Sequence, residues 1–177
     1  VSITNADLTI GKASATVTAN SANVTYNGQT QTVTGFTASG LVGGESETVL
    51  SGVSTSGGSG RHAGSHAHTA SGTDGNYNLS FVDGALTIAK ANASVTGSTT
   101  QVTYNGTTQT QSAPTSSGFI SGDAITFSGA ASGKNAGTYT SALQVSGSDA
   151  TNYNVSITNA DLTIARKDVT LAAITAA

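Results

Sequence analysis

The sequence is distinguished first by the residues that it lacks. It contains no cysteine, methionine or tryptophan, and its only proline is Pro114. Without cysteine the chain has neither disulfides nor thiolate groups for catalysis or metal binding. With few large side chains, stability must come from small apolar residues buried within sheets and from contacts between neighbouring units.

Charged residues are also scarce. Six basic side chains and nine acidic ones give a net charge of −3 at pH 7. Because there is no basic run or patch, nucleic acid is not expected as a partner. No stretch approaches the roughly 20 apolar residues that span a membrane as a helix, so no membrane span is expected in this fragment.

The most informative feature that is present is an internal repeat. The ten residues VSITNADLTI occur at Val1–Ile10 and again, letter for letter, at Val155–Ile164. A diverged copy lies at Asn78–Ala91, where Leu86 aligns with the leucines of the outer copies at spacings of 78 (86 − 8) and 76 (162 − 86). Identical segments at such distances are typical of structural units that are stacked one after another.

Two further landmarks recur in the same order, one at this spacing and one more loosely. The pentapeptide VTYNG occurs at 24–28 and at 102–106, again at a spacing of 78 (102 − 24). The segment RHAGSH at 61–66 aligns with KNAGTY at 134–139. Landmarks that recur in one order indicate a tandem repeat of about 77 residues.

The repeat divides the chain into four segments. We expect residues 1–11 to be the end hairpin of a preceding repeat and residues 12–89 to be the first full repeat. Residues 90–165 are then the second full repeat, and residues 166–177 are the start of a following one. The junction at Lys90 has no glycine or proline cluster, so we expect the repeats to form a semi-rigid, elongated rod.

Alternating apolar and polar residues predict β-strands. Two such runs, at 77–81 and 86–88, lie on either side of Asp83-Gly84. Asp-Gly between alternating runs is a strong signal for a type I′ turn, so we expect these runs to pair as a hairpin. In the outer copies we expect a three-residue loop, at 5–7 and at 159–161, to replace this turn. The Gly/Ser-rich stretch at 54–60 is instead predicted to be a mobile surface loop.

The fold class follows from these patterns. Helical spacing is nowhere sustained, and glycine recurs too often for helices. We expect an all-β chain of tandem small antiparallel β-sandwiches, immunoglobulin-like, with about seven or eight strands per repeat. Repeats of a β-grasp-like type, without a helix, are the alternative.

Three histidines in one short span are the candidate metal ligands. His66 and His68 are two positions apart, so on a strand they would project from the same face, and with His62 they could hold Zn²⁺ or Ni²⁺. Alternatively they are solvated or half-buried, with His66 in the place of Tyr139. No nucleophile elbow or matching pair of carboxylates is present, so we predict no catalytic residues, no cofactor and no enzymatic activity.

The repeat landmarks resemble a known family. The closing segments at 76–91 and 152–165, the AGTY-like segment at 135–139 and the two VTYNG segments resemble the mostly-β, glycine-rich MBG and YDG repeats of large bacterial surface adhesins. The resemblance covers nearly the whole chain. It implies an exported, filamentous, haemagglutinin-like adhesin, whose repeats act as stalks or as cell–cell and matrix contacts.

The sequence is therefore compatible with three functions. The first is a stalk segment of a secreted bacterial cell-surface adhesin, with neighbouring repeats of the same chain as its partners. The second is a module that binds host or matrix glycans or proteins, for which Phe36 and Phe119 beside glycine-flanked loops would supply aromatic contacts. The third is self-assembly with other copies of the chain through edge strands.

Overall fold

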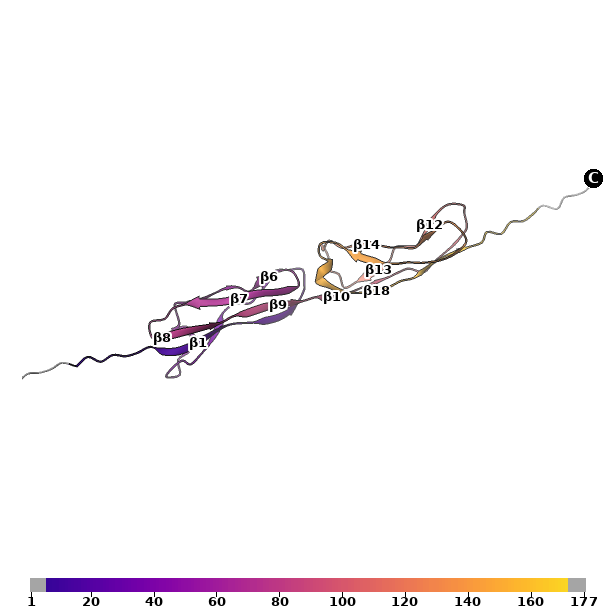
Figure 1. Ribbon diagram of the computed structural model, residues 1–177. Coiled ribbons are helices and arrows are strands. Elements are labelled where there is room, and N and C mark those ends of the chain that lie inside the picture. Colours follow the sequence, from indigo (N-terminus) through magenta and orange to yellow (C-terminus); the bar gives the residue numbers. More distant parts are fainter. Residues whose placement is uncertain (1–5, 172–177) are drawn as a thin grey trace, which may run out of the picture. The chain divides into compact units, whose positions relative to one another are not determined.

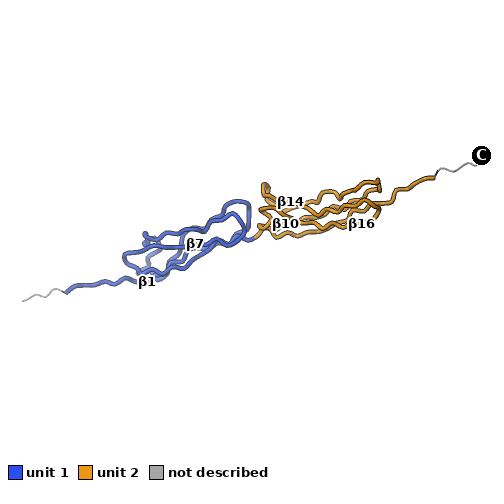
Figure 2. The backbone as a smooth tube through the Cα atoms, turned by 45° about the horizontal axis from the view of Figure 1, so that its top comes forward, with its two compact units in different colours: residues 1–89 blue, residues 90–177 orange. Residues whose placement is uncertain are grey.

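The computed structural model describes residues 6–171, and these residues form an all-β structure. The all-β prediction is therefore confirmed. The chain divides into two compact units, Val1–Ala89 and Lys90–Ala177 (Figure 2). The predicted loop at 5–7 begins outside the described residues, and residues 172–177 of the last predicted segment also lie outside them. No helix in the described part of the chain is long and apolar enough to span a membrane.

The first unit contains two main sheets and a small two-stranded ladder. The three-stranded sheet has the order β4-β1-β8, with β1 (Ala13–Ala19), β4 (Phe36–Ser39) and β8 (Tyr77–Val82). The four-stranded sheet has the order β2-β9-β7-β5, with β2 (Ala22–Thr25), β5 (Val53–Gly57), β7 (Gly64–Gly72) and β9 (Gly84–Ala89). β3 (Gln31–Thr32) pairs with β6 (Ser59–Gly60), and a 3₁₀ turn, η1 (Glu47–Val49), precedes β5.

The second unit repeats this plan with shorter strands. One sheet has the order β13-β10-β18, with β10 (Ala91–Thr96), β13 (Thr115–Ser117) and β18 (Tyr153–Thr158). Another has the order β11-β19-β16, with β11 (Thr100–Thr103), β16 (Gly137–Thr140) and β19 (Asp161–Ala165). The remaining pairs are β12 (Gln109–Thr110) with β15 (Ser132–Gly133), and β14 (Thr126–Ser128) with β17 (Gln144–Ser146); η2 (Ala150–Asn152) precedes β18.

In each unit the opening and closing strands run parallel, side by side, through both sheets (Figure 1). β1 pairs with β8, and β2 pairs with β9, at one sequence offset of 64 (77 − 13 and 86 − 22). In the second unit, β10 with β18 and β11 with β19 share an offset of 62 (153 − 91 and 162 − 100). Because the offset is the same in both sheets of a unit, the opening and closing segments pass from the first sheet into the second at the same point. We call this paired element the terminal ladder: 13–25 with 77–89, and 91–103 with 153–165.

The terminal ladder corrects two predictions. The antiparallel pairing predicted for the sandwich is wrong for the opening and closing strands of each unit, which are parallel. The hairpin at Asp83-Gly84 is also wrong, because β8 pairs with β1 whereas β9 pairs with β2 and β7. The same correction applies at 159–161, since β18 pairs with β10 and β19 pairs with β11 and β16. The β-grasp-like alternative stays a prediction.

The geometry of Gly84 explains why Asp83-Gly84 does not form the predicted type I′ turn. Its φ is not positive, as a type I′ turn would require. A Cβ at this position would instead overlap with the carbonyl oxygens of Ala19 and Asn20. This glycine therefore serves the close approach of two strands, and not a turn.

The Gly/Ser-rich stretch at 54–60 is not a loop. Most of it belongs to β5 and β6, and β5 pairs with β7 from Val53 to Gly57. Ser56 and Thr69 face each other across this pair, with their hydroxyl oxygens 3.0 Å apart. Composition suggested a mobile surface loop, but pairing of β5 with the long strand β7, and of β6 with β3, satisfies the backbone of these small residues and makes them strands.

The core is built from alternate residues of the terminal ladder. Val17 and Leu86 are fully buried in the first unit, and Leu162 is fully buried in the second. Two core clusters comprise Ala15, Val17, Ala19, Leu50, Ala70 and Tyr77 in one unit, and Ala131, Leu162 and Ile164 in the other. Phe81, which shares the period-two alternation of Tyr77, is 37% exposed on the edge strand β8.

Candidate functional site

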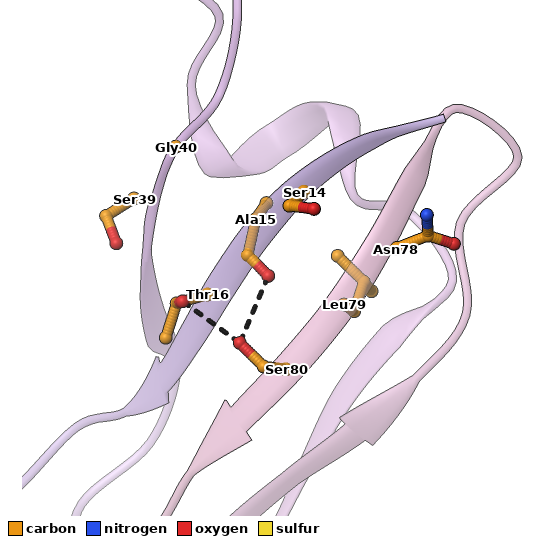
Figure 3. A pocket seen from close by; sticks show the side chains of 8 residues that line it. All are labelled: Ser14, Ala15, Thr16, Ser39, Gly40, Asn78, Leu79 and Ser80. Carbon is orange, nitrogen blue, oxygen red and sulfur yellow. Dashed lines mark hydrogen bonds between the residues drawn. The ribbon is translucent and has the colours of Figure 1, made fainter. Parts of the chain in front are cut away.

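A shallow groove of about 400 Å³ lies over the outer part of the sheet β4-β1-β8 (Figure 3). The alternation of β1 directs Ser14 and Thr16 away from the core, while Ala15 is buried between them. Thr16 lies in register with Ser39 on one side and Ser80 on the other, and the hydroxyl oxygens of Thr16 and Ser80 are 3.0 Å apart. Ser80 also donates a weak hydrogen bond of 3.4 Å to the carbonyl oxygen of Ala15.

The second unit has a groove in the equivalent place. It is lined by Asn92, Ala93 and the start of β18, and its volume is about 670 Å³. Neither groove is lined by a histidine or by an acidic or basic side chain. The polar groups that the two surfaces present are hydroxyl, amide and backbone groups, which can exchange hydrogen bonds with a polar partner, and they lie beside apolar side chains such as Leu79 and Val155.

A buried tyrosine fixes the long loop of each unit to the closing strand. In the first unit the Tyr77 hydroxyl donates to the carboxylate of Glu45 and accepts a 3.0 Å hydrogen bond from the backbone N–H of Val42. In the second, the Tyr153 hydroxyl donates to Asp123 at 2.5 Å and accepts from the N–H of Ile120 at 2.9 Å. These two arrangements make the same pair of contacts with different residues.

Both tyrosines have a raised pKa. For Tyr77 the main cause is the hydrogen bond to Glu45, which favours the protonated phenol. For Tyr153 the main cause of the raised pKa is burial, and the hydrogen bond to Asp123 adds to it. The phenols are therefore held in the protonated form, as hydrogen-bond donors to the carboxylates.

The structure does not bring the three histidines together as a metal centre. The Nε2 atom of His66 lies 3.0 Å from the carbonyl oxygen of His62, and Nδ1 of the buried His68 lies 2.8 Å from that of Asn20. A ring nitrogen that donates its proton to a carbonyl has no lone pair for a metal. Among the described residues, no group of three or more His, Cys, Asp or Glu side chains is placed to hold a metal ion.

The alternative interpretation of His66 agrees with the geometry. His66 is in register with Leu86, as Tyr139 is with Leu162 in the second unit. The Tyr139 hydroxyl donates a 3.0 Å hydrogen bond to the carbonyl of Asn135, four positions earlier, as His66 does to His62. Each ring also lies over a glycine whose missing Cβ leaves room for it, and these glycines are Gly60 and Gly133. His66 thus fills the place of Tyr139.

The first unit matches a known protein family over most of its length. Residues 15–87 match the family model of the MBG domain (YGX type). The predicted resemblance to MBG-type repeats is confirmed by this match, which spans most of both main sheets of the first unit. No match was found among curated proteins or among solved structures.

The acidic partners of the tyrosines were missed in the sequence. In the first unit Glu45 follows Gly44, and in the second unit Asp123 follows Gly122, at the spacing of the VTYNG landmark, 78 (123 − 45). In a chain with only nine acidic residues, such a coincidence is a usable signal.

The two phenylalanines expected to offer aromatic contacts are used internally. The ring of Phe119 packs on Tyr153 at a centroid distance of 4.9 Å. Phe36 is partly buried and packs against the core cluster of the first unit. Neither ring therefore serves as an open platform for a ligand.

Removing the tyrosine hydroxyl should weaken the second unit. Tyr153→Phe deletes two hydrogen bonds, one of them to a carboxylate, so we expect a loss of about 1.5–3 kcal/mol in the free energy of unfolding. Tyr139→Phe, which deletes one bond to a carbonyl, is the matched control and should cost about 0.5–1.5 kcal/mol. Denaturant unfolding followed by circular dichroism measures both. Equal losses would contradict the role assigned to Tyr153.

Alkaline pH should destabilise both units through the same hydroxyls. Because the folded pKa of Tyr77 and Tyr153 is raised, the folded state retains protons that the unfolded chain loses above about pH 10. Their contribution to stability is therefore complete below that pH and is lost as the pH rises through the folded pKa. Unfolding free energies measured between neutral and alkaline pH test this. The double variant Y77F/Y153F should show a shallower decline, and an identical decline would refute the assignment.

Proposed function

We propose that the chain is a structural stalk segment of a secreted bacterial cell-surface adhesin, which holds a binding region away from the cell and takes part in attachment to surfaces and other cells, as in biofilms. The observation that carries this proposal is the direction of the terminal ladder. A parallel ladder places the entry and the exit of each unit at opposite ends. Each unit therefore acts as a spacer.

The spacing that one unit supplies can be estimated. The chain enters the first ladder at Ala13, beside Tyr77, and leaves it at Ala89, beside Thr25. Twelve residue steps of about 3.3 Å separate these ends by roughly 40 Å. An antiparallel arrangement would return the chain to its starting end, and adding repeats would then add little length.

The end segments support the proposed division into repeats. Leu8 and Ile10 are 87% and 85% exposed, whereas Leu162 and Ile164, in the identical segment, are 0% and 2% exposed. Leu8 and Ile10 thus have the sequence of a closing strand but are not buried. We propose that residues 1–11 close a preceding repeat, that 12–89 and 90–165 are full repeats, and that residues 166–177 open a following one. In this proposal the repeats join as an elongated rod.

The chemistry of the surface supports contacts made without ionic recognition. With a net charge of −3 and grooves lined by neutral groups, the chain favours neighbouring repeats and neutral host or matrix glycans and proteins over nucleic acid as partners. We propose an extracellular location and no enzymatic activity.

Labelling of intact cells tests this function. Antibodies raised against the purified chain should bind non-permeabilised cells that carry the full-length protein, and deletion of residues 12–89 should bring the outermost epitope closer to the cell by one spacer length. Attachment of the cells should weaken in that strain. Labelling only after permeabilisation would overturn the proposal, and so would a deletion that changes neither reach nor attachment.

Self-assembly is a second candidate because the edge strand β8 is uncharged. In the described part of the chain β8 pairs with β1 alone, and its residues 77–82 include no charge or proline that would block another strand. Phe81 and Val82 on this edge are 37% and 48% exposed. Sedimentation at increasing protein concentration should then show dimers that Ser80→Lys abolishes, and a monomer at every concentration would refute this candidate.

A further inference from the structure

We propose that the terminal ladder of each unit is a mechanical clamp, in which tension along the chain loads all the inter-strand hydrogen bonds in shear at the same time. The proposal rests on the proposed stalk function for the origin of the tension. The clamp itself follows from strand direction, register and burial.

The direction of loading comes from the two ends of the ladder. At the entry, the N–H of Ala13 donates to the carbonyl of Asn76 at 2.9 Å, and at the exit the N–H of Tyr26 donates to the carbonyl of Ala89 at 2.8 Å. Tension pulls Ala13 and Ala89 apart along the strand axes. The opening strand must then slide past the closing strand, and the bonds between these ends share the load.

Each strand of the clamp is also held from its other side. In the first half of the ladder β1 is the inner strand and pairs with β4, whereas in the second half β9 is the inner strand and pairs with β7. Neither segment can slide without disrupting an antiparallel pair as well. The opening and closing segments are therefore each restrained over one half of their length.

Burial and side-chain contacts protect the clamp from water. The side chains of Val17 on β1 and Leu86 on β9 are both 0% exposed. The inner face of the ladder is therefore closed to water, which would otherwise compete for its hydrogen bonds. Where the ladder changes sheets, the hydroxyl of Ser21 on the opening segment accepts a 3.1 Å hydrogen bond from the N–H of Ala85 on the closing segment. This hydrogen bond thus links the opening and closing segments at the point where they pass from one sheet to the other.

The second unit has an independent clamp of the same design. The N–H of Gly97 donates to the carbonyl of Thr158 at 2.8 Å, and the N–H of Tyr104 donates to that of Ala165 at 2.9 Å. Val95 and Leu162 close its inner face, at 1% and 0% exposure. The same mechanics should therefore be measurable twice in one molecule.

The absence of cysteine allows a direct test by single-molecule force spectroscopy on the full chain. Handles attached to Lys12→Cys and Lys90→Cys pull the first unit in shear. Handles attached to Lys12→Cys and Gly75→Cys pull the neighbouring starts of β1 and β8 apart and open the ladder one bond at a time. All three positions are exposed, and a Cβ at Gly75 meets nothing within 4 Å.

We expect a several-fold higher unfolding force for the 12/90 pair than for the 12/75 pair at one pulling rate. The pairs 90/166 and 90/151 should reproduce this difference in the second unit. Thermal unfolding of each variant without handles confirms that the fold is retained. Equal forces in the two directions would overturn the clamp and leave the labelling result untouched, whereas a failure of cell-surface labelling would leave the measured forces unchanged.

Discussion

Replacing Leu162 with alanine is expected to lower the free energy of unfolding of the second unit by about 2–5 kcal/mol. Leu162 is fully buried and forms a core cluster with Ala131 and Ile164. The substitution removes apolar contacts and leaves a cavity that a sheet with fixed register cannot close. A loss of this size should lower the unfolding midpoint of a unit of this length by on the order of ten degrees. Calorimetry or circular dichroism measures the shift.

The chain supplies an unusually close control for this substitution. Leu8 lies in the identical ten-residue sequence and is 87% exposed. Leu8→Ala changes the same local propensities without loss of burial, so the unfolding free energy should change by no more than about 0.5 kcal/mol. If the two substitutions destabilise the protein equally, the burial assigned to Leu162 is wrong.

Gly129→Ala is expected to destabilise the second unit by more than about 2 kcal/mol, because two penalties combine. The φ angle of Gly129 is +84°, a left-handed conformation that costs residues with a side chain about 1–2 kcal/mol. In addition, the new Cβ would overlap with the carbonyl oxygen of Ala142. The backbone shift that relieves this overlap would strain the 2.8 Å hydrogen bond from the N–H of Ala142 to the carbonyl of Gly129.

Gly106 separates these two penalties. Its φ of +82° is nearly the same, but a Cβ added there meets nothing within 4 Å. Gly106→Ala should therefore cost only the conformational term of about 1–2 kcal/mol. Denaturant unfolding of both variants gives the difference, which reports the overlap alone. A cost at Gly106 as large as that at Gly129 would show that the overlap contributes nothing.

Much of the fold was accessible from the sequence, and the reason is repetition. The all-β class and the resemblance to MBG repeats follow from segments that recur at fixed spacing, and burial of Tyr77, Leu86 and Leu162 follows from period-two alternation. What failed was strand pairing. Asp83-Gly84 has the composition of a turn, but its neighbours pair with strands near the start of the unit, and no local pattern encodes such distant partners.

The candidate site was less predictable. The histidine cluster suggested a metal site because imidazole groups commonly ligate metals. The ring nitrogens of His66 and His68 instead face backbone carbonyls, and only the three-dimensional fold determines where those carbonyls lie. Conversely, the carboxylates of Glu45 and Asp123 gain their importance from tyrosines far along the chain, at sequence separations of 32 and 30.

The pairing of the first strand of each unit with the last has a consequence for how the chain acquires its structure. Ala13, at the start of the first unit, finds its neighbour only when Tyr77, near the end of that unit, has also become available. Contacts between such distant residues form slowly, because a large loop must close before they are made. During synthesis, an incomplete unit thus lacks its terminal ladder until the closing strands have been made.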